Sequence, residues 1–320
     1  MKKILVLGAG GQIGSELVVA LRKQYGYANV IASDISAEAE QNISVDGPFF
    51  RADVTDGNAI SDLVKKHKID TIYNLAALLS AVAETKPQAA WNVGINGHYN
   101  VLEIARANDC AVFFPSSIGA FGPNTPSQNT PQDTIQRPQT MYGVTKVTGE
   151  LLSDYYFKRY GVDTRGVRYP GIISNVTLPG GGTTDYAVEI YYEAIKKGSY
   201  TSPLKKGTFL DMMYMPDAVD AAINLMEANP ARLKHRNCFN ITAMSIDPEA
   251  ISNSINKVIP EFTLYYKPEE AKQEIADSWP DSMDDSAARH EWDWNPKFKL
   301  DDMTEDMLQS VKKKFEKNLI

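Results

Sequence analysis

Short apolar runs alternate with segments of helical periodicity through the first half of the chain. Runs of four to six residues rich in apolar, β-branched and aromatic side chains predict strands. Apolar residues spaced three and four apart between these runs predict helices. The expected strands are Lys3–Leu7, Val30–Ser33, Phe49–Ala52, Thr71–Leu75, Val112–Pro115 and Thr164–Tyr169, and the expected helices include Ile60–Lys66, Pro87–Ala107 and Tyr142–Tyr160. Such alternation is typical of a parallel sheet that helices cover on both faces.

The regular alternation ends near Tyr169, and a more mixed pattern follows. The elements expected there are a strand at Phe209–Tyr214, a helix at Pro216–Glu227, a strand at Phe239–Ile241, and helices at Pro248–Ile259 and Asp301–Asn318. We therefore predict an α/β fold, a doubly wound parallel sheet with a smaller C-terminal substrate lobe. The predicted sheet domain covers 1–174 with a returning segment near 208–242, and the predicted lobe covers 175–207 and 243–320.

A glycine-rich turn joins the first expected strand to a helical pattern. Gly8, Gly11 and Gly14 follow four consecutive apolar residues. Glycines at these positions permit a tight turn and the close approach of a pyrophosphate to a helix N-terminus. The second strand ends at Asp34, about 20 residues further on, where an acid can bond the ribose hydroxyls of a dinucleotide. The pattern predicts a Rossmann-type sheet that binds a dinucleotide; the alternative is an ordinary strand–turn–helix with a surface aspartate.

Composition narrows the class of protein. With 43% hydrophobic and 23% charged residues the chain is typical of a globular protein, and its net charge of −7 disfavours nucleic acid or an anionic membrane as a partner. No apolar run reaches the roughly 20 residues of a membrane helix, and the chain starts directly with an expected strand, so we expect no signal peptide. Cys110 and Cys238 lie far apart and the four histidines are scattered. We therefore expect a cytoplasmic protein without a metal site, its cysteines packed as small apolar residues.

Tyr142 and Lys146 are the strongest candidates for chemistry. They lie four residues apart in an expected helix, so they share one face. An ammonium beside a phenol favours the phenolate, which can take the proton of a hydroxyl group. Ser117 follows an expected strand, at the edge of the sheet where such folds bind ligands. Taken alone, the tyrosine and lysine would more simply be an exposed pair; the glycine turn and Ser117 favour a catalytic set.

Together these motifs resemble the extended short-chain dehydrogenase/reductase family. The matching residues are Gly8, Gly11, Gly14, Asp34, Asp53 with Val54, Asn74 to Ala77, Ser117, Tyr142 and Lys146. Further segments resemble the branch of that family that oxidises the side-chain hydroxyl of L-threonine with NAD. These segments are Pro115–Gly122, Arg168–Ser174, Gly181–Ala187 and Ser278–Pro280, followed by Asp285 and Trp292.

The resemblance implies a role for each matching residue. Tyr142 would take the hydroxyl proton, Ser117 would hold that oxygen, and Lys146 would also bond the nicotinamide ribose. The implied NAD-binding residues are Gly8, Gly11, Gln12, Ile13, Gly14, Asp34, Asp53, Val54, Leu75, Ala76, Ala77, Ser116, Tyr142, Lys146, Tyr169 and Ile172. The implied substrate-binding residues are Ser80, Ser117, Tyr142, Gly182, Thr184, Asp185 and Trp279. An ordinary loop or packing role is the alternative for five of these residues, namely Ser80, Gly182, Thr184, Asp185 and Trp279.

Two other functions fit parts of the pattern. A nucleotide-sugar epimerase or dehydratase of the same fold must neutralise a second diphosphate. The basic run 232–236 could do so, but it precedes a strand and indicates a solvated turn, whereas Gly180–Asp185 suits a single carboxylate. A cofactor-sensing protein without activity would need no Ser117, Tyr142 and Lys146.

Two expectations concern larger parts of the molecule. Helices 87–107 and 142–160 carry apolar residues on more than one side, which together with the resemblance predicts a homodimer through them. The glycine-rich run Pro179–Thr184 and the segment around Trp279 are expected to close over a bound substrate.

Overall fold

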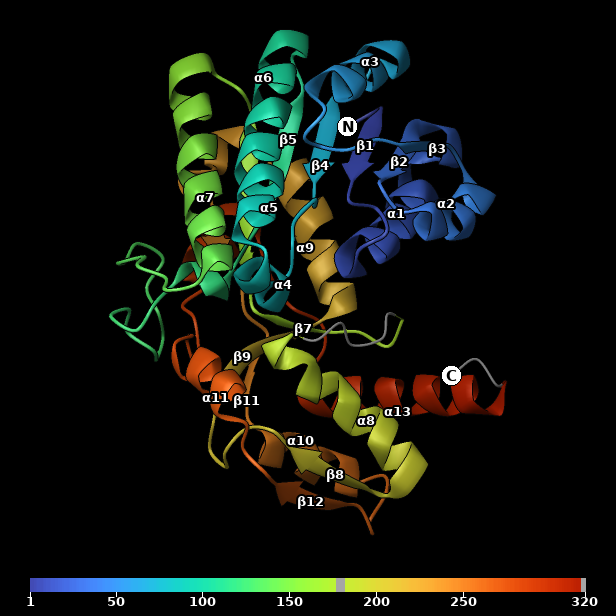
Figure 1. The fold of residues 1–320 in the computed structure, drawn as a ribbon, viewed down its shortest axis with the longest axis vertical. Coiled ribbons are helices and arrows are strands. Elements are labelled where there is room, and N and C mark those ends of the chain that lie inside the picture. Colours follow the sequence, from blue (N-terminus) through green and yellow to red (C-terminus); the bar gives the residue numbers. More distant parts are fainter. Residues whose placement is uncertain (177–181, 318–320) are drawn as a thin grey trace.

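A parallel sheet forms the centre of the structure. The computed structural model describes residues 1–176 and 182–317, and in them the main sheet has seven strands (Figure 1). Its strand order is β10-β6-β5-β4-β1-β2-β3, with every paired neighbour parallel. The strands are β1 (Ile4–Leu7), β2 (Val30–Asp34), β3 (Phe49–Arg51), β4 (Thr71–Asn74), β5 (Ala111–Ser117), β6 (Thr164–Tyr169) and β10 (Phe239–Asn240). The predicted doubly wound parallel sheet is confirmed. The order reverses between β1 and β4, the place where such sheets open a ligand crevice.

Helices cover both faces of this sheet. One face carries α1 (Gln12–Tyr25), α9 (Met215–Glu227) and α12 (Ser286–Trp292), whose apolar side chains share a core with β1, β2 and β6. The other face carries α3 (Gly57–His67), α6 (His98–Asn108) and α7 (Met141–Tyr160). Among the short helices, α2 (Ala37–Ile43) packs beside β2 and β3. The short helices α4 (Ser80–Thr85) and α5 (Pro87–Trp91) pack against α7, and α5 lies below α6 in Figure 1. Burial on both faces explains why the strands are continuous apolar runs.

A second lobe lies beyond the carboxyl ends of the strands. It contains a three-stranded sheet, β11-β9-β7, and a two-stranded sheet, β12-β8. Its strands are β7 (Gly171–Ile173), β8 (Ser199–Ser202), β9 (Leu210–Tyr214), β11 (Met244–Ile246) and β12 (Thr263–Tyr266). Its helices are α8 (Tyr186–Lys197), α10 (Pro248–Asn256), α11 (Glu270–Asp277) and α13 (Leu300–Glu316). These elements share a separate apolar core, and Figure 1 shows them below the main sheet.

The expected strands at Phe209–Tyr214 and Phe239–Ile241 both exist, but they join different sheets. The first becomes β9 of the lobe, and the second becomes β10 beside β6 of the main sheet. An apolar run predicts a strand but not the strand with which it pairs. The sequence therefore could not show which run joins the main sheet and which joins the sheet of the lobe. The predicted domain boundaries stay a prediction.

The expected single helix Pro87–Ala107 is instead a composite. It consists of α5, a π-helical stretch at Asn92–Gly97 and α6, which ends at Asn108. Close packing accompanies the change. A Cβ at Gly94 would lie 3.0 Å from the Thr145 side chain of α7, and one at Gly97 would lie 2.6 Å from Val54. Wider π turns of this kind often occur near functional sites.

The ends of other elements differ from the prediction by a few residues. Strand β5 continues through Ser116 and Ser117, which places both hydroxyls in the strand itself. Helix α13 begins at Leu300, and Asn318, its predicted end, lies outside the described residues. No helix in the described part of the chain is long and apolar enough to cross a membrane.

Candidate active site

The glycine turn between β1 and α1 is shaped by close backbone contacts. Gly8 has a φ of +75°, which favours glycine, and a Cβ there would lie 2.8 Å from the backbone nitrogen of Ala76. A Cβ at Gly14 would lie 2.3 Å from the Gly8 carbonyl oxygen, so only glycine permits this packing of helix on turn. Gly11 is different, because its side-chain direction meets nothing closer than 3.4 Å.

Gly11 is also the N-cap of α1, and none of the described side chains caps this helix N-terminus. A helix start with uncapped N–H groups beside an open glycine fits the pyrophosphate of a dinucleotide. Asp34, at the end of β2, lies next to it. Its carboxylate accepts hydrogen bonds from the backbone nitrogens of Gly10 (2.8 Å) and Ser36 (3.0 Å). The residues present therefore fit the predicted cofactor at both the diphosphate and the adjacent ribose.

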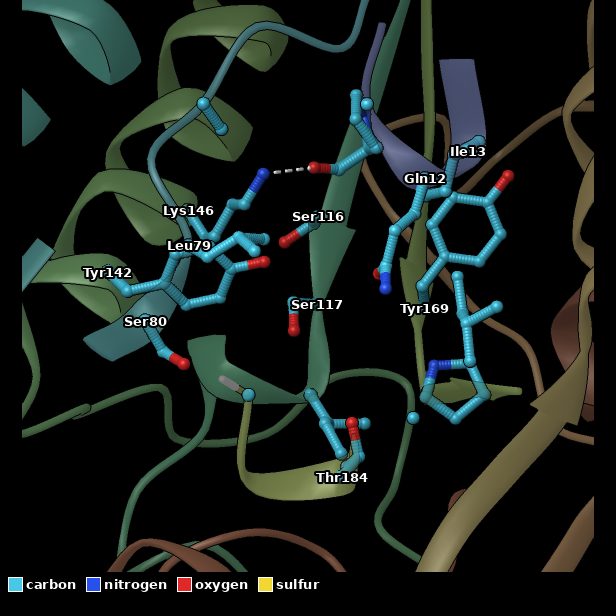
Figure 2. A pocket seen from close by; sticks show the side chains of 18 of the residues that line it. Gln12, Ile13, Leu79, Ser80, Ser116, Ser117, Tyr142, Lys146, Tyr169 and Thr184 are labelled. Atoms are coloured by element: carbon cyan, nitrogen blue, oxygen red, sulfur yellow. Dashed lines mark hydrogen bonds between the residues drawn. The ribbon is translucent and has the colours of Figure 1, made fainter. Parts of the chain in front are cut away.

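A cavity of about 270 Å³ opens beside the glycine turn, at the carboxyl ends of β1, β5 and β6 (Figure 2). Most of the predicted site residues line this one cavity, although they come from seven or more separate segments of the chain. Those residues are Gly8, Gly11, Gln12, Ile13, Gly14, Leu75, Ala77, Ser80, Ser116, Ser117, Tyr142, Lys146, Tyr169, Ile172, Gly182, Thr184, Asp185 and Trp279.

Four predicted cofactor residues do not line the cavity: Asp34, Asp53, Val54 and Ala76. Asp34 and Ala76 lie outside the cavity wall and contact the glycine turn. The Asp53 carboxylate accepts hydrogen bonds from the backbone nitrogen and hydroxyl of Thr55, both at 2.8 Å. Val54 is buried near Gly97. Their roles at the adenosine end stay predictions.

Helix α7 presents Tyr142 and Lys146 to the cavity. The helix begins at a Thr140 cap, whose hydroxyl oxygen accepts the Gly143 N–H at 3.1 Å. Lys146 is buried, and its Nζ lies 5.2 Å from the centroid of the Tyr142 ring. The same Nζ donates a hydrogen bond to the Pro115 carbonyl oxygen at 2.7 Å. The two side chains are therefore part of the cavity wall, and the interpretation of an exposed pair is wrong.

Two glycines bring the start of α7 against the end of β5. A Cβ at Gly143 would lie 2.2 Å from the Gly119 carbonyl oxygen, and one at Gly119 would lie 3.1 Å from the Tyr142 ring. The Ser117 Oγ accepts the Gly119 N–H at 3.1 Å, which holds the serine at this turn. Figure 2 shows the Tyr142 hydroxyl pointing toward β5, where Ser117 lies. A phenol, an ammonium and a hydroxyl thus surround one space, a set suited to proton transfer from an alcohol.

The substrate end of the cavity combines distant segments. Ser80 begins α4, Thr184 lies in the 3₁₀ turn Thr183–Asp185, and Trp279 follows α11. The Asp185 carboxylate accepts the Gly182 N–H at 2.6 Å, which shapes this turn. All five residues line the cavity, so none is a remote loop residue. The part of the predicted mobile run that covers 179–181 lies outside the described residues.

The chain is similar to known proteins over most of its length. The model of the NAD dependent epimerase/dehydratase family matches residues 4–242. The chain belongs to this family. The extended short-chain dehydrogenase/reductase resemblance is therefore confirmed, and the family implies a nicotinamide nucleotide as cofactor.

The similarity to individual proteins extends over nearly the full length of this chain. A Staphylococcus aureus (strain USA300) protein described as an uncharacterized epimerase/dehydratase is 54% identical over 314 residues, 98% of either chain. The structure of L-threonine dehydrogenase from Clostridium difficile is 57% identical, with a TM-score of 0.97 and 98% of each chain covered. That of L-threonine dehydrogenase from Phytophthora infestans is 48% identical, with a TM-score of 0.93, and covers 98% of this chain and 100% of that one. These comparisons support an oxidoreductase-type enzyme.

Two further structures concern the epimerase alternative and the oligomeric state. A UDP-glucose 4-epimerase from Thermotoga maritima is 23% identical with a TM-score of 0.82 over 99% of this chain and 100% of that one, a likeness that shows the fold alone. A monomeric L-threonine 3-dehydrogenase from a metagenome is 42% identical with a TM-score of 0.92 over 97% of this chain and 99% of that one. Oligomeric state therefore needs its own test.

Sequence reasoning missed several residues of the cavity wall in this family member: Leu79, Pro115, Ile118, Pro170, Gly171 and Thr183. Most are apolar and lie next to predicted residues. Apolar side chains carry no chemical signature, so they contribute nothing to a motif search. The ends of β5 and β6 were the available signal, because Pro115 lies in the last three residues of β5, Pro170 directly follows β6, and these strand ends face the crevice.

The basic run 232–236 is the predicted solvated turn only in part, because Arg232 and Lys234 are exposed but Arg236 is not. Arg236 is buried, pairs with Asp163 at 2.7 Å and lies 4.1 Å from the centroid of the Phe157 ring. Arg232 donates to Asp293 at 2.9 Å, and the His235 Nδ1 lies 2.5 Å from the Glu291 carboxylate. Acids of the same chain hold these groups, and none of the run lines the cavity.

The remaining titratable candidates have structural roles. His98 is fully buried, with its ring nitrogens 3.1 Å from the Asn74 amide and 2.9 Å from the Ser153 hydroxyl, and burial lowers its pKa to about 3. Cys110 and Cys238 are buried and form no disulfide. Within the described ranges, no group of three or more His, Cys, Asp or Glu side chains is arranged to hold a metal ion.

Proposed function

We propose that this enzyme oxidises the side-chain hydroxyl of L-threonine to a ketone, giving 2-amino-3-oxobutanoate, with NAD as the oxidant. One observation carries the proposal. Tyr142, Lys146 and Ser117 line the same small cavity as the glycine turn, together with Ser80, Thr184 and Trp279. The similarity to solved L-threonine dehydrogenases along nearly the full length supports the same substrate.

Each side chain then has a defined task. The Tyr142 side chain, as the phenolate, accepts the proton of the substrate hydroxyl and becomes the phenol, and the Ser117 hydroxyl holds that oxygen during the transfer. The Lys146 ammonium, 5.2 Å from the centre of the Tyr142 ring, stabilises the negative charge of the deprotonated phenol. When bound, NAD would accept the hydride from the carbon atom that carries this hydroxyl. Trp279 is largely buried at the cavity wall and excludes water from the reacting groups.

The charge of the cavity favours a small substrate. Lys146 is the one cation among the described residues that line it, and it is already bonded to the Pro115 carbonyl. A nucleotide sugar would bring a second diphosphate, whose charges need several cationic or N–H donors. Arg232, His235 and Arg236 of the basic run pair with acids elsewhere in the chain. These observations favour an amino acid over a nucleotide sugar.

The choice of NAD over NADP follows from Asp34. Its carboxylate lies at the ribose end of the glycine turn, where the 2′-phosphate of NADP would bring a second negative charge. We expect NAD to be preferred by at least about tenfold in kcat/KM, and Asp34→Ala to narrow this preference. Steady-state kinetics with both cofactors measures it. Equal efficiency with NADP would contradict the role of Asp34.

The deciding experiment compares two substrates. Purified protein is mixed with NAD and L-threonine, and formation of NADH is followed by its absorbance. A parallel reaction offers UDP-galactose and is analysed for UDP-glucose. We expect NADH only with L-threonine. Epimerisation of the sugar without threonine oxidation would support the epimerase alternative, and NAD binding without either reaction would support the sensing alternative.

We also propose a homodimer formed through the face of α5, α6 and α7. Large apolar side chains on this face remain exposed, among them Trp91 (46%), Leu151 (63%) and Tyr155 (52%). Such a concentration is typical of a surface that a partner covers. A second copy is the natural occupant because the helices can pair symmetrically.

A further inference from the structure

The face of α7 that carries Tyr142 and Lys146 continues one turn further to Glu150. The three residues are spaced by four, so they share this face. Glu150 is not exposed to the cavity. Its side chain is 3% exposed and contacts Ser116 of β5 and Arg168 of β6, residues that adjoin the cavity-lining Ser117 and Tyr169.

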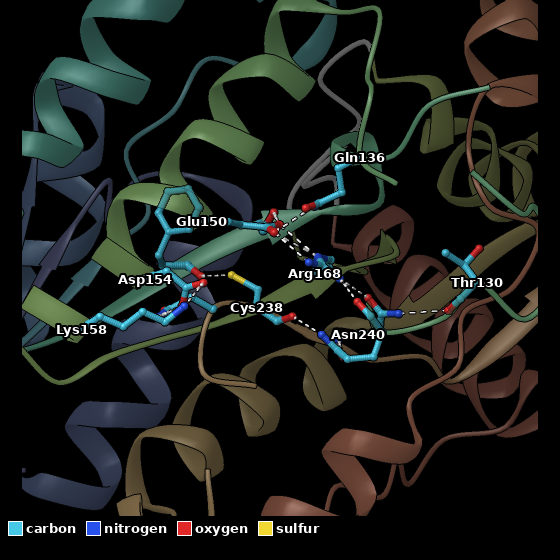
Figure 3. Close-up of polar contacts among 12 residues, drawn as sticks. Thr130, Gln136, Glu150, Asp154, Lys158, Arg168, Cys238 and Asn240 are labelled. Atoms are coloured by element: carbon cyan, nitrogen blue, oxygen red, sulfur yellow. Dashed lines mark hydrogen bonds and ion pairs between the residues drawn. The ribbon is translucent and has the colours of Figure 1, made fainter. Parts of the chain in front are cut away.

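The Glu150 carboxylate is fully engaged. It accepts hydrogen bonds from the Ser116 hydroxyl and from the Gln136 amide at 2.9 Å. Arg168, also buried, donates to it from Nε at 3.1 and 3.2 Å and from a terminal nitrogen at 2.9 Å (Figure 3). The other terminal nitrogen of Arg168 bonds the Gln132 carbonyl at 2.8 Å and the Asn240 amide oxygen at 3.0 Å.

Such a buried pair is a poor source of stability. Removing two charges from water costs about as much as their attraction returns. What the pair does supply is a fixed arrangement, because it joins the catalytic helix α7 to β6, and through Ser116 to β5. Arg168 precedes Tyr169 and Ser116 precedes Ser117, both of which line the cavity.

The pair also fixes the direction of the Ser116 hydrogen bond. An ionised carboxylate accepts hydrogen bonds and cannot donate them, so the Ser116 hydroxyl must donate to Glu150. Ser116 lines the cavity, and toward a ligand there its oxygen can only accept hydrogen bonds. Figure 2 shows this hydroxyl on the side of β5 that faces Tyr142 and Lys146.

We propose that Glu150, held by Arg168, makes Ser116 an obligate hydrogen-bond acceptor for an N–H group at the nicotinamide end of the cofactor. The proposal rests on the proposed cofactor, because the carboxamide of nicotinamide is the amide N–H donor at that end. Ser116 is then a binding residue that accepts a hydrogen bond from the carboxamide N–H. Glu150 and Arg168 are positioning residues, because they determine that the Ser116 oxygen accepts this bond and does not donate one.

The test compares NAD with nicotinic acid adenine dinucleotide, in which a carboxylate replaces the carboxamide and no N–H is available. Affinities for both are measured by calorimetry on the full chain without threonine. Ser116→Ala should weaken NAD binding about fivefold, the usual effect of one lost hydrogen bond, and should leave the binding of the acid analogue unchanged or tighter. Ser116→Thr, which keeps the hydroxyl, should retain the parent ratio of affinities.

Glu150→Gln gives the second arm. The new amide can donate to Ser116, which frees the serine hydrogen for the cavity, so the preference for NAD over the acid analogue should fall. In a Ser116→Ala background the same change should have no further effect on that preference. Gln136→Ala is the matched control, because it removes a bond to Glu150 without touching Ser116, and the ratio should stay at the parent value.

Three outcomes overturn the proposal: equal losses for both dinucleotides, additive effects of Ser116→Ala and Glu150→Gln, or unchanged NAD binding by Ser116→Ala. If Glu150→Gln does not fold, the Ser116→Ala and Ser116→Thr comparison still decides. A protein that binds NAD selectively but leaves threonine unoxidised would refute the proposed substrate and not this inference. A protein that binds neither dinucleotide would refute both.

Discussion

At the scale of single residues, Tyr142 is the group on which the proposed chemistry depends most directly. Its ring lies against Gly119 and near the Lys146 ammonium, so Tyr142→Phe removes the phenol oxygen and little else. We expect threonine oxidation to fall by a factor on the order of a hundred or more, with NAD affinity and thermal stability close to the parent. Tyr155→Phe, on the exposed side of the same helix, is the control and should retain activity.

Kinetics and NAD titration check this expectation. Turnover by Tyr142→Phe within a few-fold of the parent would show that another group accepts the proton. Because the reaction needs a deprotonated phenol, the rate of the parent enzyme should also rise toward alkaline pH.

Asp211 predicts a pH dependence of stability. It is fully buried on β9, where its carboxylate accepts the Met283 N–H at 2.7 Å and the Thr242 hydroxyl, and burial raises its pKa from 3.8 to about 8, with the nearby Asp285 adding to the effect. The folded state thus holds this proton more tightly than the unfolded state. The resulting stabilisation is complete below about pH 4 and is lost as the pH rises through 8.

Asp211→Asn mimics the neutral acid, so the melting temperature of the variant minus that of the parent should increase from pH 5 to pH 9. Thermal denaturation at several pH values measures this difference. A difference that stays constant over the range would show that Asp211 does not titrate in the folded protein within it.

At the scale of elements, the approach of α7 to the end of β5 is the critical packing. Gly143 makes it possible, since a Cβ there would lie 2.2 Å from the Gly119 carbonyl oxygen and 2.4 Å from a Pro138 carbon. Gly143→Ala should therefore displace the first turn of α7, lowering stability by about 1–3 kcal/mol and reducing turnover more than NAD affinity. Val144→Ala, one residue along and exposed, is the control. Parent-like turnover by Gly143→Ala would show that the turn adapts without moving Tyr142.

The same elements show how far sequence reasoning reaches. The strands of the main sheet and the shared helix face of Tyr142 and Lys146 were predictable, because apolar runs and a spacing of four residues are local signals. The π-helical stretch at Asn92–Gly97 was not, and the close packing that accompanies it, against Thr145 and Val54, joins positions far apart in the sequence. Nor was the bonding of Ser116 to Glu150, which joins residues 34 positions apart through a buried contact.

At the scale of the whole molecule, the prediction concerns assembly. If a second copy covers the α5–α7 face, Leu151→Glu should convert the dimer to a monomer, because it places a charge at an apolar contact. Analytical ultracentrifugation measures this, with Val258→Glu, exposed on the lobe, as control. A parent protein that sediments as a monomer, as the similar metagenomic enzyme is described, would refute the dimer.

The repeated crossing of the chain between the main sheet and the lobe has a mechanical consequence. The backbone passes from β6 directly to β7, from β9 directly to α9, and again between β10 and β11. Each crossing is a covalent link, so a movement of the lobe relative to the main sheet requires backbone rotation at all of them together. Opening of the cavity at the short segments of its rim, the turn at Thr183–Asp185 and the stretch that bears Trp279, requires no such concerted change. We therefore expect these two segments to govern access to the cavity, with the lobe and the sheet keeping their relative position.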